Sequence, residues 1–543
     1  MTALDVLEQL QGQAVARGRA LALLETSGRR VTFAQLQTRI ETAASALGDE
    51  GLRPGDRVLF TVPPGIDSIV LILAIVRAGG VVVAANPLMG PEVFAGRVRL
   101  MEPSWVMATS LVYLFGQISH FRFSRQFPDL TAVPAKTFVR VGPRMPFHRP
   151  MMGMRSLLRA RRSISPAVPR EPDDPVMVVF TSGTTAAPRA VVHTNASIGA
   201  ALEMMSHEER FAVGDVLYSD QLHLVLPALL AGITTVIARG RFRPARLMDH
   251  LQRYGVTHTF GVPSDYQDLI EYASRRRLTF PASVRRVLLG SAPVPTTFLR
   301  RLRAVVPPST RVTSVYAMTE IIPVCRADLD EKLAFVGEGD LVGTPVKGVA
   351  VRIAADGELI VRGPNLCRGY WGDEPISEVA TGDFGTVDRN GRVILLGRKK
   401  AMIIRRGENI YPELFESTIA GIDGVRRCCL VGLYRDRQAD EQVVLCIEPE
   451  AGAGGATLRS RVERELQQGP HRIDRAALPD RIILMPIPLA ERSKKVDRSA
   501  VIAALAHIPS LSGGDLNAFP SPSGGETDAF LSPSGGGQGG GPC

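Results

Sequence analysis

Short apolar runs alternate with amphipathic helical patterns from Val31 to Pro87. Gly55 and Asp56 mark a turn, and the run from Arg57 to Val62 predicts a buried strand. The same rhythm returns further along, as apolar runs followed by turn residues, at Gly214–Ala238, Val256–Val262 and Val284–Pro293. Alternation of this kind is typical of a layered α/β protein.

The chain of 543 residues is too long for one compact core. We expect a large N-terminal α/β domain over 1–398 and a smaller, mobile C-terminal α+β domain over 399–507. The smaller domain should contain strands near Arg427–Leu433 and Gln442–Glu448.

Residues 508–543 are rich in Gly, Ser and Pro and contain the near-repeat SGGDLNAFPSP and SGGETDAFLSP. This composition buries too little apolar area to offset the entropy of ordering, so a disordered tail is expected. Phe519 and Phe530 leave open a role as short docking elements, although such tails are more often flexible ends.

The net charge of +10 is concentrated between Phe121 and Arg170, where eleven Lys or Arg face the single acid Asp129. Arg155, Arg159 and Arg162 follow helical spacing, with Met and Leu residues at 151, 152, 154, 157 and 158 in the same stretch. This pattern is suited to peripheral contact with an anionic membrane. A solvated basic loop explains the same residues and is the favoured interpretation. Nucleic acid is not an expected partner, because a binding motif and stacking aromatic residues are missing from the sequence.

Other features indicate a cytoplasmic protein. The apolar stretch near Ile69–Val76 is too short to span a bilayer, and the N-terminus MTALDVLEQLQ is acidic where a secretory signal is basic. Six cysteines are scattered without metal-ligand spacing, which fits a reduced compartment. The sequence does not indicate an oligomeric state.

The segment VFTSGTTAAPRAVV at 179–192 has the composition of a loop that wraps an anion. A β-branched run precedes five small or hydroxylated residues, and backbone N–H groups, hydroxyls and a nearby cation can together surround a polyphosphate. The residues concerned are Thr181, Ser182, Gly183, Thr184, Thr185 and Arg189. A Ser/Thr/Gly surface turn explains this segment equally well when it is taken alone.

Four further motifs follow in a fixed order: VYAMTE at 315–320, ATGDFG at 380–385, GRKKAMIIRRGENIYPELFE at 397–416 and RSKKVDR at 492–498. With the first loop, this order resembles the superfamily of adenylate-forming enzymes, which includes acyl-CoA synthetases, adenylation domains and luciferase. The resemblance covers Val31 to about Leu505. It implies ATP and Mg²⁺ as cofactors, and a large domain with a mobile cap that turns at Lys400.

The resemblance also implies roles for individual residues. The Thr181–Thr185 loop holds the β- and γ-phosphates, Tyr316 stacks on adenine, and Thr319 contacts the α-phosphate. Glu320 and Thr184 hold Mg²⁺, which prefers hard oxygen ligands. Asp383 binds the ribose hydroxyls, Arg398 approaches ribose and phosphate, and Lys495 bridges the substrate carboxylate and the α-phosphate. The adenine pocket takes in Gly290, Ser291, Ala292, Ala317 and Met318.

The chain departs from the family pattern at several positions. Ala186, Ala190 and Ala317 replace typical glycines, and Arg189 replaces a typical lysine with a planar fork. Arg406 fills the first position of a frequent double glycine, where it either obstructs the acceptor tunnel or grips coenzyme A. His223 lies near where many relatives carry an aromatic–histidine pair, but packing in the surrounding apolar run is the favoured interpretation.

We expect an AMP-forming acid–thiol ligase that converts a carboxylic acid to acyl-AMP and then to acyl-CoA. The apolar segments Leu222–Ile233 and Leu111–Phe115 favour a fatty or hydrophobic acid. Three alternatives stay open. An olefin β-lactone synthetase would use an internal hydroxyl, an acyl-AMP ligase would deliver to an acyl carrier protein, and a non-catalytic homologue would serve as a nucleotide-binding scaffold.

Overall fold

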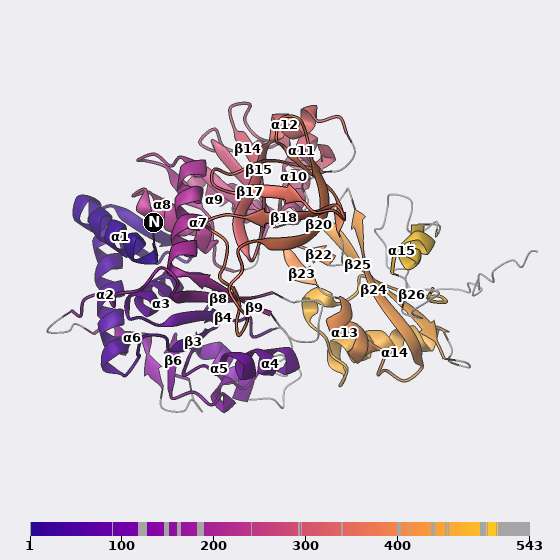
Figure 1. Ribbon diagram of the computed structural model, residues 1–543, viewed down its shortest axis with the longest axis horizontal. Helices are drawn as coiled ribbons and strands as arrows, with labels where there is room; N and C mark the ends of the chain where they lie inside the picture. Colours follow the sequence, from indigo (N-terminus) through magenta and orange to yellow (C-terminus); the bar gives the residue numbers. More distant parts are fainter. Residues whose placement is uncertain are drawn as a thin grey trace, which may run out of the picture.

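The protein is described from a computed structural model (Figure 1). The structure describes residues 2–88, 91–117, 127–145, 151–159, 164–181, 189–240, 242–291, 294, 296–337, 340–398, 403–410, 412–435, 440–450, 453, 455–488, 496, 498–506 and 508.

The described strands of the first sheet run in the order β19-β9-β8-β4-β3-β5-β6-β7, with the pairs from β8 to β7 parallel. Val82 faces one apolar cluster with α2 and α3, whereas Val81 and Val83 face another with α4 and α5. Both faces of these strands are therefore buried, as expected of a parallel sheet. The strands are β3 (Arg57–Phe60), β4 (Val81–Ala84), β5 (Trp105–Thr109), β6 (Thr137–Val141), β7 (Met152–Gly153), β8 (Pro175–Thr181), β9 (Arg189–Thr194) and β19 (Gly369–Tyr370). The helices are α1 (Ala3–Arg17), α2 (Phe33–Asp49), α3 (Ile66–Arg77), α4 (Pro91–Met101), α5 (Ser110–Gln117) and α6 (Met154–Leu157), with a 3₁₀ turn at Leu130–Ala132.

The second sheet has a parallel part and an antiparallel part, which meet at β14, and β2 pairs antiparallel with β1 at its edge. Among the described residues its order is β17-β18-β20-β21-β16-β15-β14-β13-β12-β10-β11-β1-β2, parallel from β14 to β1 and antiparallel from β14 to β17. Its strands are β1 (Leu21–Glu25), β2 (Arg30–Thr32), β10 (Val216–Tyr218), β11 (Thr234–Ile237), β12 (His258–Gly261), β13 (Arg286–Leu289), β14 (Arg311–Met318), β15 (Ile321–Asp328), β16 (Asp340–Pro345), β17 (Ala350–Ile353), β18 (Glu358–Arg362), β20 (Val379–Val387) and β21 (Val393–Arg398). Its helices are α7 (Asn195–Glu209), α8 (Leu222–Leu230), α9 (Pro244–Arg253), α10 (Pro263–Arg276), α11 (Thr296–Arg303) and α12 (Leu329–Ala334).

The smaller C-terminal domain lies beside these sheets (Figure 1). The guanidinium of Arg498 ties its last helix to the rest of it, donating to Glu416 Oε1 at 2.8 Å and to the Leu430 carbonyl at 2.6 Å. The elements are β22 (Ile403–Arg405), β23 (Glu408–Ile410), α13 (Pro412–Ile419), β24 (Val425–Arg435), β25 (Asp440–Pro449), α14 (Gly455–Gln468), a 3₁₀ turn (Arg475–Ala477), β26 (Arg481–Leu484) and α15 (Arg498–Ala506). A large α/β domain with a smaller C-terminal domain is therefore confirmed. The two strands expected in the small domain correspond to β24 and β25, each longer than the sequence indicated.

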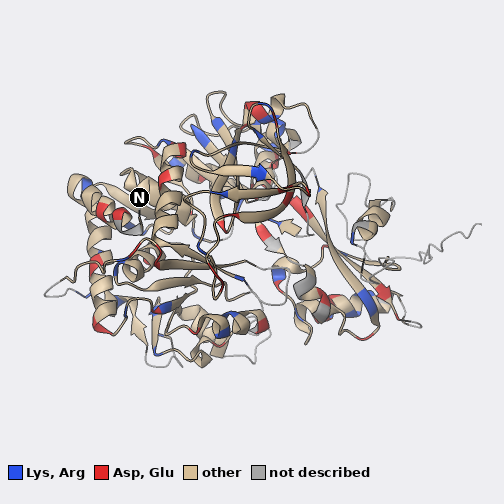
Figure 2. Cartoon of the chain, viewed as in Figure 1, with Lys and Arg blue, Asp and Glu red and all other residues tan. Residues whose placement is uncertain are grey.

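The basic segment 121–170 does not fold as an amphipathic helix over its described residues. The helix there, α6, is four residues long, and Met154 and Leu157 are buried in the main core at 8% and 0% exposure. The side chains that would have met a membrane are thus used for packing. Basic and acidic positions alternate over the face shown in Figure 2. No described helix is long and apolar enough to cross a membrane.

The segment Leu111–Phe115, whose apolar character favoured a hydrophobic acid, lies on α5. Tyr113 is fully buried there, and its hydroxyl donates to the carbonyls of Val106 at 3.0 Å and Val139 at 3.1 Å. Burial raises the pKa of this hydroxyl well above its usual range. Tyr113 therefore joins α5 to β5 and β6, and its side chain belongs to the core.

Candidate active site

The predicted site residues divide into those that the structure describes and those that it does not. Thr181 ends β8, Arg189 begins β9, and the two residues are paired in the antiparallel register. The loop between them, with Ser182, Gly183, Thr184 and Thr185, lies outside the described residues, as do Ala292, Lys400 and Lys495. Arg398 is described as the last residue of β21, without its side chain.

Arg189 stands over an aromatic ring at the start of β9. Its guanidinium carbon lies 4.6 Å from the ring centroid of Tyr370, which belongs to the short strand β19. A cation at this distance from a tyrosine ring is attracted to the ring face. The stacking therefore fixes a positive charge next to the end of the predicted phosphate loop.

Tyr370 also contacts the carboxylate predicted to hold the metal. Its hydroxyl donates to Glu320 Oε1 at 2.9 Å, and Glu320 is buried at 7% exposure. Burial, and then the charge of Glu320, raise the pKa of Tyr370 to about 12. The hydroxyl consequently keeps its proton and acts as a donor at physiological pH.

A buried histidine holds the backbone beside Glu320. His193 of β9 lies with Nε2 at 2.8 Å from the carbonyl oxygen of Thr319. Burial lowers the pKa of His193, so the ring is neutral, and a carbonyl can accept but not donate. We therefore assign the ring proton to Nε2, which makes His193 the donor.

The predicted ribose residue lies beside the predicted adenine residue. The Tyr316 hydroxyl donates to Asp383 Oδ2 at 2.6 Å, although 67 residues separate the two in the chain. Asp383 is buried at 5% exposure, and its backbone N–H donates to Thr381 Oγ1 at 3.1 Å.

The turn before Asp383 is held by a third carboxylate. Gly382 has φ of +75°, a conformation that favours glycine, and its N–H donates to Glu358 Oε1 at 2.8 Å. Asp383 and Arg398 are direct partners in the β20–β21 hairpin. The spacing of about fifteen residues between the two motifs thus corresponds to one hairpin.

The end of β13 comes close to both Tyr316 and the small domain. A Cβ at Gly290 would lie 3.4 Å from the ring of Phe260 and 3.6 Å from the Val315 carbonyl, so this residue is next to β14. Ser291 follows with φ of +66°. Ala317 and Met318 complete β14, where the register with β15 shifts. Gly290 is thus next to the strand that ends in Tyr316, Ala317 and Met318.

The small domain reaches this region with the turn between β22 and β23. A side chain at Gly407 would meet Val262 Cγ1 at 2.7 Å and Ser291 Cβ at 3.4 Å. The neighbouring Arg406 has φ of +52°, and its N–H donates to Asp440 Oδ1 at 2.8 Å. The turn therefore packs closely on the strand ends that carry the predicted nucleotide residues.

Carboxylates of α10 lie close enough to Arg406 to interact with its charge. Burial raises the pKa of Asp265 to about 6, and the Arg406 guanidinium opposes this rise. Burial likewise raises the pKa of Asp268, against the same opposing charge. Arg406 thus faces acidic groups of the large domain in this arrangement.

His223, near the N-terminus of α8, lies edge-on to the ring of Phe260 at 6.1 Å, and burial lowers its pKa to about 4. It is therefore neutral, which agrees with the interpretation as a packed histidine.

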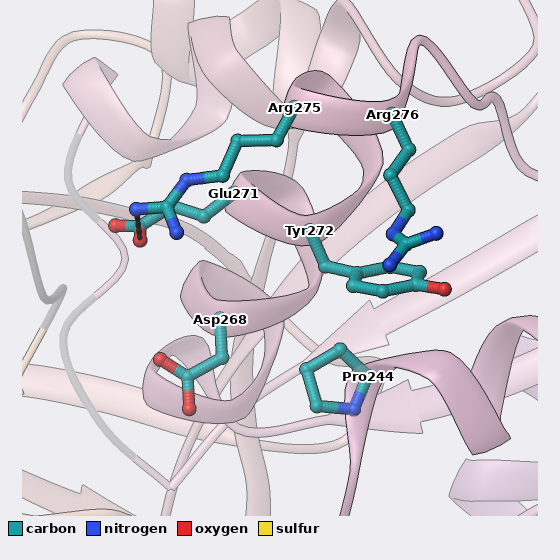
Figure 3. Close-up of a pocket in the computed structure, with 6 residues that line it drawn as sticks. All are labelled: Pro244, Asp268, Glu271, Tyr272, Arg275 and Arg276. Carbon is teal, nitrogen blue, oxygen red and sulfur yellow. Dashed lines mark ion pairs between the residues drawn. The ribbon is translucent and has the colours of Figure 1, made fainter.

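A surface depression of about 540 Å³ follows α10 (Figure 3). Arg276 lies over the Tyr272 ring at 5.0 Å, and Arg275 pairs with Glu271 at 3.6 Å. The depression contains none of the predicted site residues. We therefore assign the depression no role in nucleotide binding.

Three residues of the site were missed by sequence reasoning: His193, Tyr370 and Glu358. His193 lies in an apolar strand and Tyr370 in a segment without a charge or metal-ligand pattern, so neither carried a chemical signal of its own. The clue to Glu358 would have been an acidic residue at the start of a strand that pairs with the TGD motif.

The family model described as AMP-binding enzyme matches residues 10–371. A feruloyl-CoA synthase of an Amycolatopsis species is 29% identical over 430 residues, which cover 75% of this chain and 81% of that protein. An indoleacetate–CoA ligase of Aromatoleum aromaticum is 28% identical over 84% of this chain and 90% of that protein.

Solved structures share the fold. The amide bond synthetase McbA of Marinactinospora thermotolerans aligns with a TM-score of 0.75 at 22% identity, over 93% of this chain and 99% of that one. The o-succinylbenzoate CoA synthetase of Bacillus subtilis aligns at 19% identity in two states. Its double mutant bound with a product analogue, OSB-NCoA, gives a TM-score of 0.73 over 90% of this chain and 97% of that one. Its complex with the acyl-adenylate intermediate gives 0.60 over 91% and 97%.

The family match covers well over half of the chain, and the residues that it spans include both strands of the predicted phosphate hairpin and the Tyr316–Glu320 motif. The chain belongs to the AMP-binding enzyme family.

Proposed function

We propose that the protein is an AMP-forming acid–thiol ligase. It would join a carboxylic acid to the α-phosphate of ATP, release pyrophosphate, and pass the acyl group to the thiol of coenzyme A. The observation that carries this proposal is the meeting of Arg189, Tyr370 and Glu320, which puts a cation and a buried carboxylate at adjoining strand ends. A metal–triphosphate complex needs both, because its phosphates require positive charge and its metal a hard oxygen ligand.

The nucleotide would lie along the strand ends of the second sheet. Tyr316, Ala317 and Met318 with Gly290, Ser291 and Ala292 would enclose adenine, and Asp383 with Arg398 would bind ribose. The 181–185 loop and Arg189 would hold the β- and γ-phosphates. Residues of these types can bind each part of ATP.

Magnesium fits this set of residues. Glu320 supplies one buried carboxylate, and Mg²⁺ is commonly held by one or two carboxylates together with substrate phosphates and water. We assign Glu320 and Thr184 to the ion, which when bound neutralises charge on the leaving pyrophosphate. Thr319 would contact the α-phosphate, and its carbonyl is held by His193.

Lys495 would complete the first step. Its ammonium would lie between the substrate carboxylate and an α-phosphate oxygen, reducing their repulsion as the anhydride bond forms. Because Lys495 belongs to the small domain, adenylation requires that this domain bring the residue to the nucleotide. We therefore propose domains over 1–398 and 399–507 that turn about Lys400.

The described arrangement fits the second step better than the first. The β22–β23 turn packs against Val262 and Ser291. The higher alignment score with the synthetase bound to a CoA product analogue than with its acyl-adenylate complex supports the same interpretation. In this pose Arg406 faces Asp265 and Asp268. Its positive charge would reduce the repulsion between these two carboxylates and the phosphates of coenzyme A.

The acid substrate is proposed to be apolar, of the fatty or the aryl class. The α8 segment is apolar throughout most of its length, and the two relatives named above act on feruloyl and indoleacetate groups. The test is product analysis by mass spectrometry after incubation with ATP, Mg²⁺ and a panel of fatty, β-hydroxy fatty and aryl acids, with and without coenzyme A. A thioester formed with coenzyme A supports the proposal, whereas a β-lactone or an adenylate unchanged by coenzyme A contradicts its second step.

A further inference from the structure

The short segment 366–371 joins the two sheets at the site. The N–H of Cys367 donates to the Glu320 carbonyl at 2.8 Å, and Ile321 forms a bridge with Leu366. On its other side, the N–H of Trp371 donates to the Ala190 carbonyl at 2.8 Å. Glu320 precedes β15 of the second sheet and Ala190 lies in β9 of the first, so this segment fixes the spacing between the two.

Tyr370 is the side chain of this segment that faces both functional groups. Its ring supports the Arg189 guanidinium at 4.6 Å, and its hydroxyl holds Glu320 Oε1 at 2.9 Å. One residue thus contacts the cation expected to bind phosphate and the carboxylate expected to bind metal.

We propose that Tyr370 is a positioning residue that sets the Glu320 carboxylate for the metal and the Arg189 guanidinium for the triphosphate. This inference rests on the proposed function. The hydroxyl takes one carboxylate oxygen and thereby fixes the direction of the other, Oε2, which we assign to the metal. The ring keeps the long Arg189 side chain in one place, which reduces the entropy lost when phosphate binds.

The two contacts can be separated by substitution. Tyr370→Phe removes the hydroxyl but keeps the ring, so it acts on Glu320 and leaves Arg189 supported. Tyr370→Ala removes both. Tyr113→Phe is a matched control, because it also removes a buried hydroxyl that makes hydrogen bonds, in the core of the first sheet and away from the predicted nucleotide residues.

Calorimetry with an ATP analogue that carries a methylene group between the α- and β-phosphates measures binding without reaction. We expect Tyr370→Phe to raise the Mg²⁺ concentration needed for half-maximal analogue affinity by about tenfold, within the range for a hydrogen bond to a charged group. AMP binding without metal should change less than about twofold, since AMP lacks the phosphates and the metal concerned. Tyr370→Ala should also weaken analogue binding at saturating Mg²⁺, and Tyr113→Phe should leave both metal dependence and AMP binding as in the wild type.

The outcomes separate this inference from the proposed function. If the analogue affinity of Tyr370→Phe depends on Mg²⁺ as in the wild type, the positioning role is overturned. Binding of the analogue by the wild type would still support the nucleotide site in that case. A parallel loss of AMP and analogue binding also overturns the positioning role, because it would indicate a general structural effect. Failure of the wild type to bind the analogue with Mg²⁺ overturns the proposed function itself.

Discussion

The hydroxyl of Tyr316 and the carboxylate of Asp383 are joined by a hydrogen bond of 2.6 Å between β14 and β20. The two residues belong to separate motifs, and the bond brings the expected adenine and ribose sites together. A carboxylate held in this way loses less rotational freedom when it accepts hydrogen bonds from a sugar.

Substitution of these two residues should weaken nucleotide binding to different degrees. Asp383→Ala removes the acceptor for two ribose hydroxyls, and we expect roughly a hundredfold loss of AMP affinity, since hydrogen bonds to a charged group contribute about 1.5–3 kcal/mol. Tyr316→Phe leaves the carboxylate in place but removes the hydrogen bond to its Oδ2, and we expect about a three- to tenfold loss. Calorimetry with AMP measures both, and equal affinities for the two variants would contradict the assignment.

Lys495 provides a test of the first chemical step. Lys495→Ala should abolish acyl-AMP formation, because the repulsion between carboxylate and α-phosphate is no longer offset, while ATP binding is largely kept. Isotope exchange between ATP and pyrophosphate measures the step directly. Exchange at the wild-type rate would refute the role of Lys495.

Arg406 provides a test of the second step. Arg406→Gly removes the charge that faces Asp265 and Asp268 and restores a residue suited to φ of +52°. We expect the KM for coenzyme A to rise several-fold, because two carboxylates then face a polyanion, with ATP–pyrophosphate exchange unchanged.

A matched double variant also removes the negative charge of Asp265, which faces Arg406. Asp265→Asn combined with Arg406→Gly should recover most of the lost affinity for coenzyme A, since the uncompensated charge is reduced. A lower KM in Arg406→Gly alone would show that the arginine obstructs the acceptor tunnel.

The free energy of unfolding should depend on pH because of Glu209, at the end of α7. Burial raises the pKa of this carboxyl from 4.5 to about 7, in spite of the nearby Arg286 guanidinium. The folded protein therefore holds a proton that the unfolded chain releases between these values, so the free energy of unfolding falls as pH rises through this window.

Glu209→Gln should remove this contribution. The variant should be more stable than the wild type at pH 8, by about 3 kcal/mol at most, and the difference should vanish near pH 4.5. Urea unfolding at a series of pH values measures it. A difference that stays constant with pH would contradict the raised pKa.

Much of the fold and part of the site could be predicted from the sequence. The apolar runs gave the layered α/β class, and the interval between Asp383 and Arg398 corresponds to two partners in one hairpin. The α/β class and this hairpin could be predicted because each depends on residues that are close together in the chain.

The parts that could not be predicted depend on distant contacts. Glu320 and Tyr370 are fifty residues apart and meet because a two-residue strand joins the two sheets. His193 reads as part of an apolar strand, and its bond to Thr319 spans 126 residues. The short helix that contains Arg155 depends on distant contacts too, because the core of the large domain buries Met154 and Leu157.

The central claim is that this chain activates a carboxylic acid with ATP and transfers it to a thiol. The most direct measurement is the joint quantification of pyrophosphate, AMP and acyl product in a reaction with a hydrophobic acid, ATP, Mg²⁺ and coenzyme A. The account predicts that all three form in equal amounts, and that omission of coenzyme A leaves pyrophosphate release with an adenylate that hydroxylamine traps. No pyrophosphate release with any acid of the fatty, β-hydroxy fatty or aryl classes would contradict it.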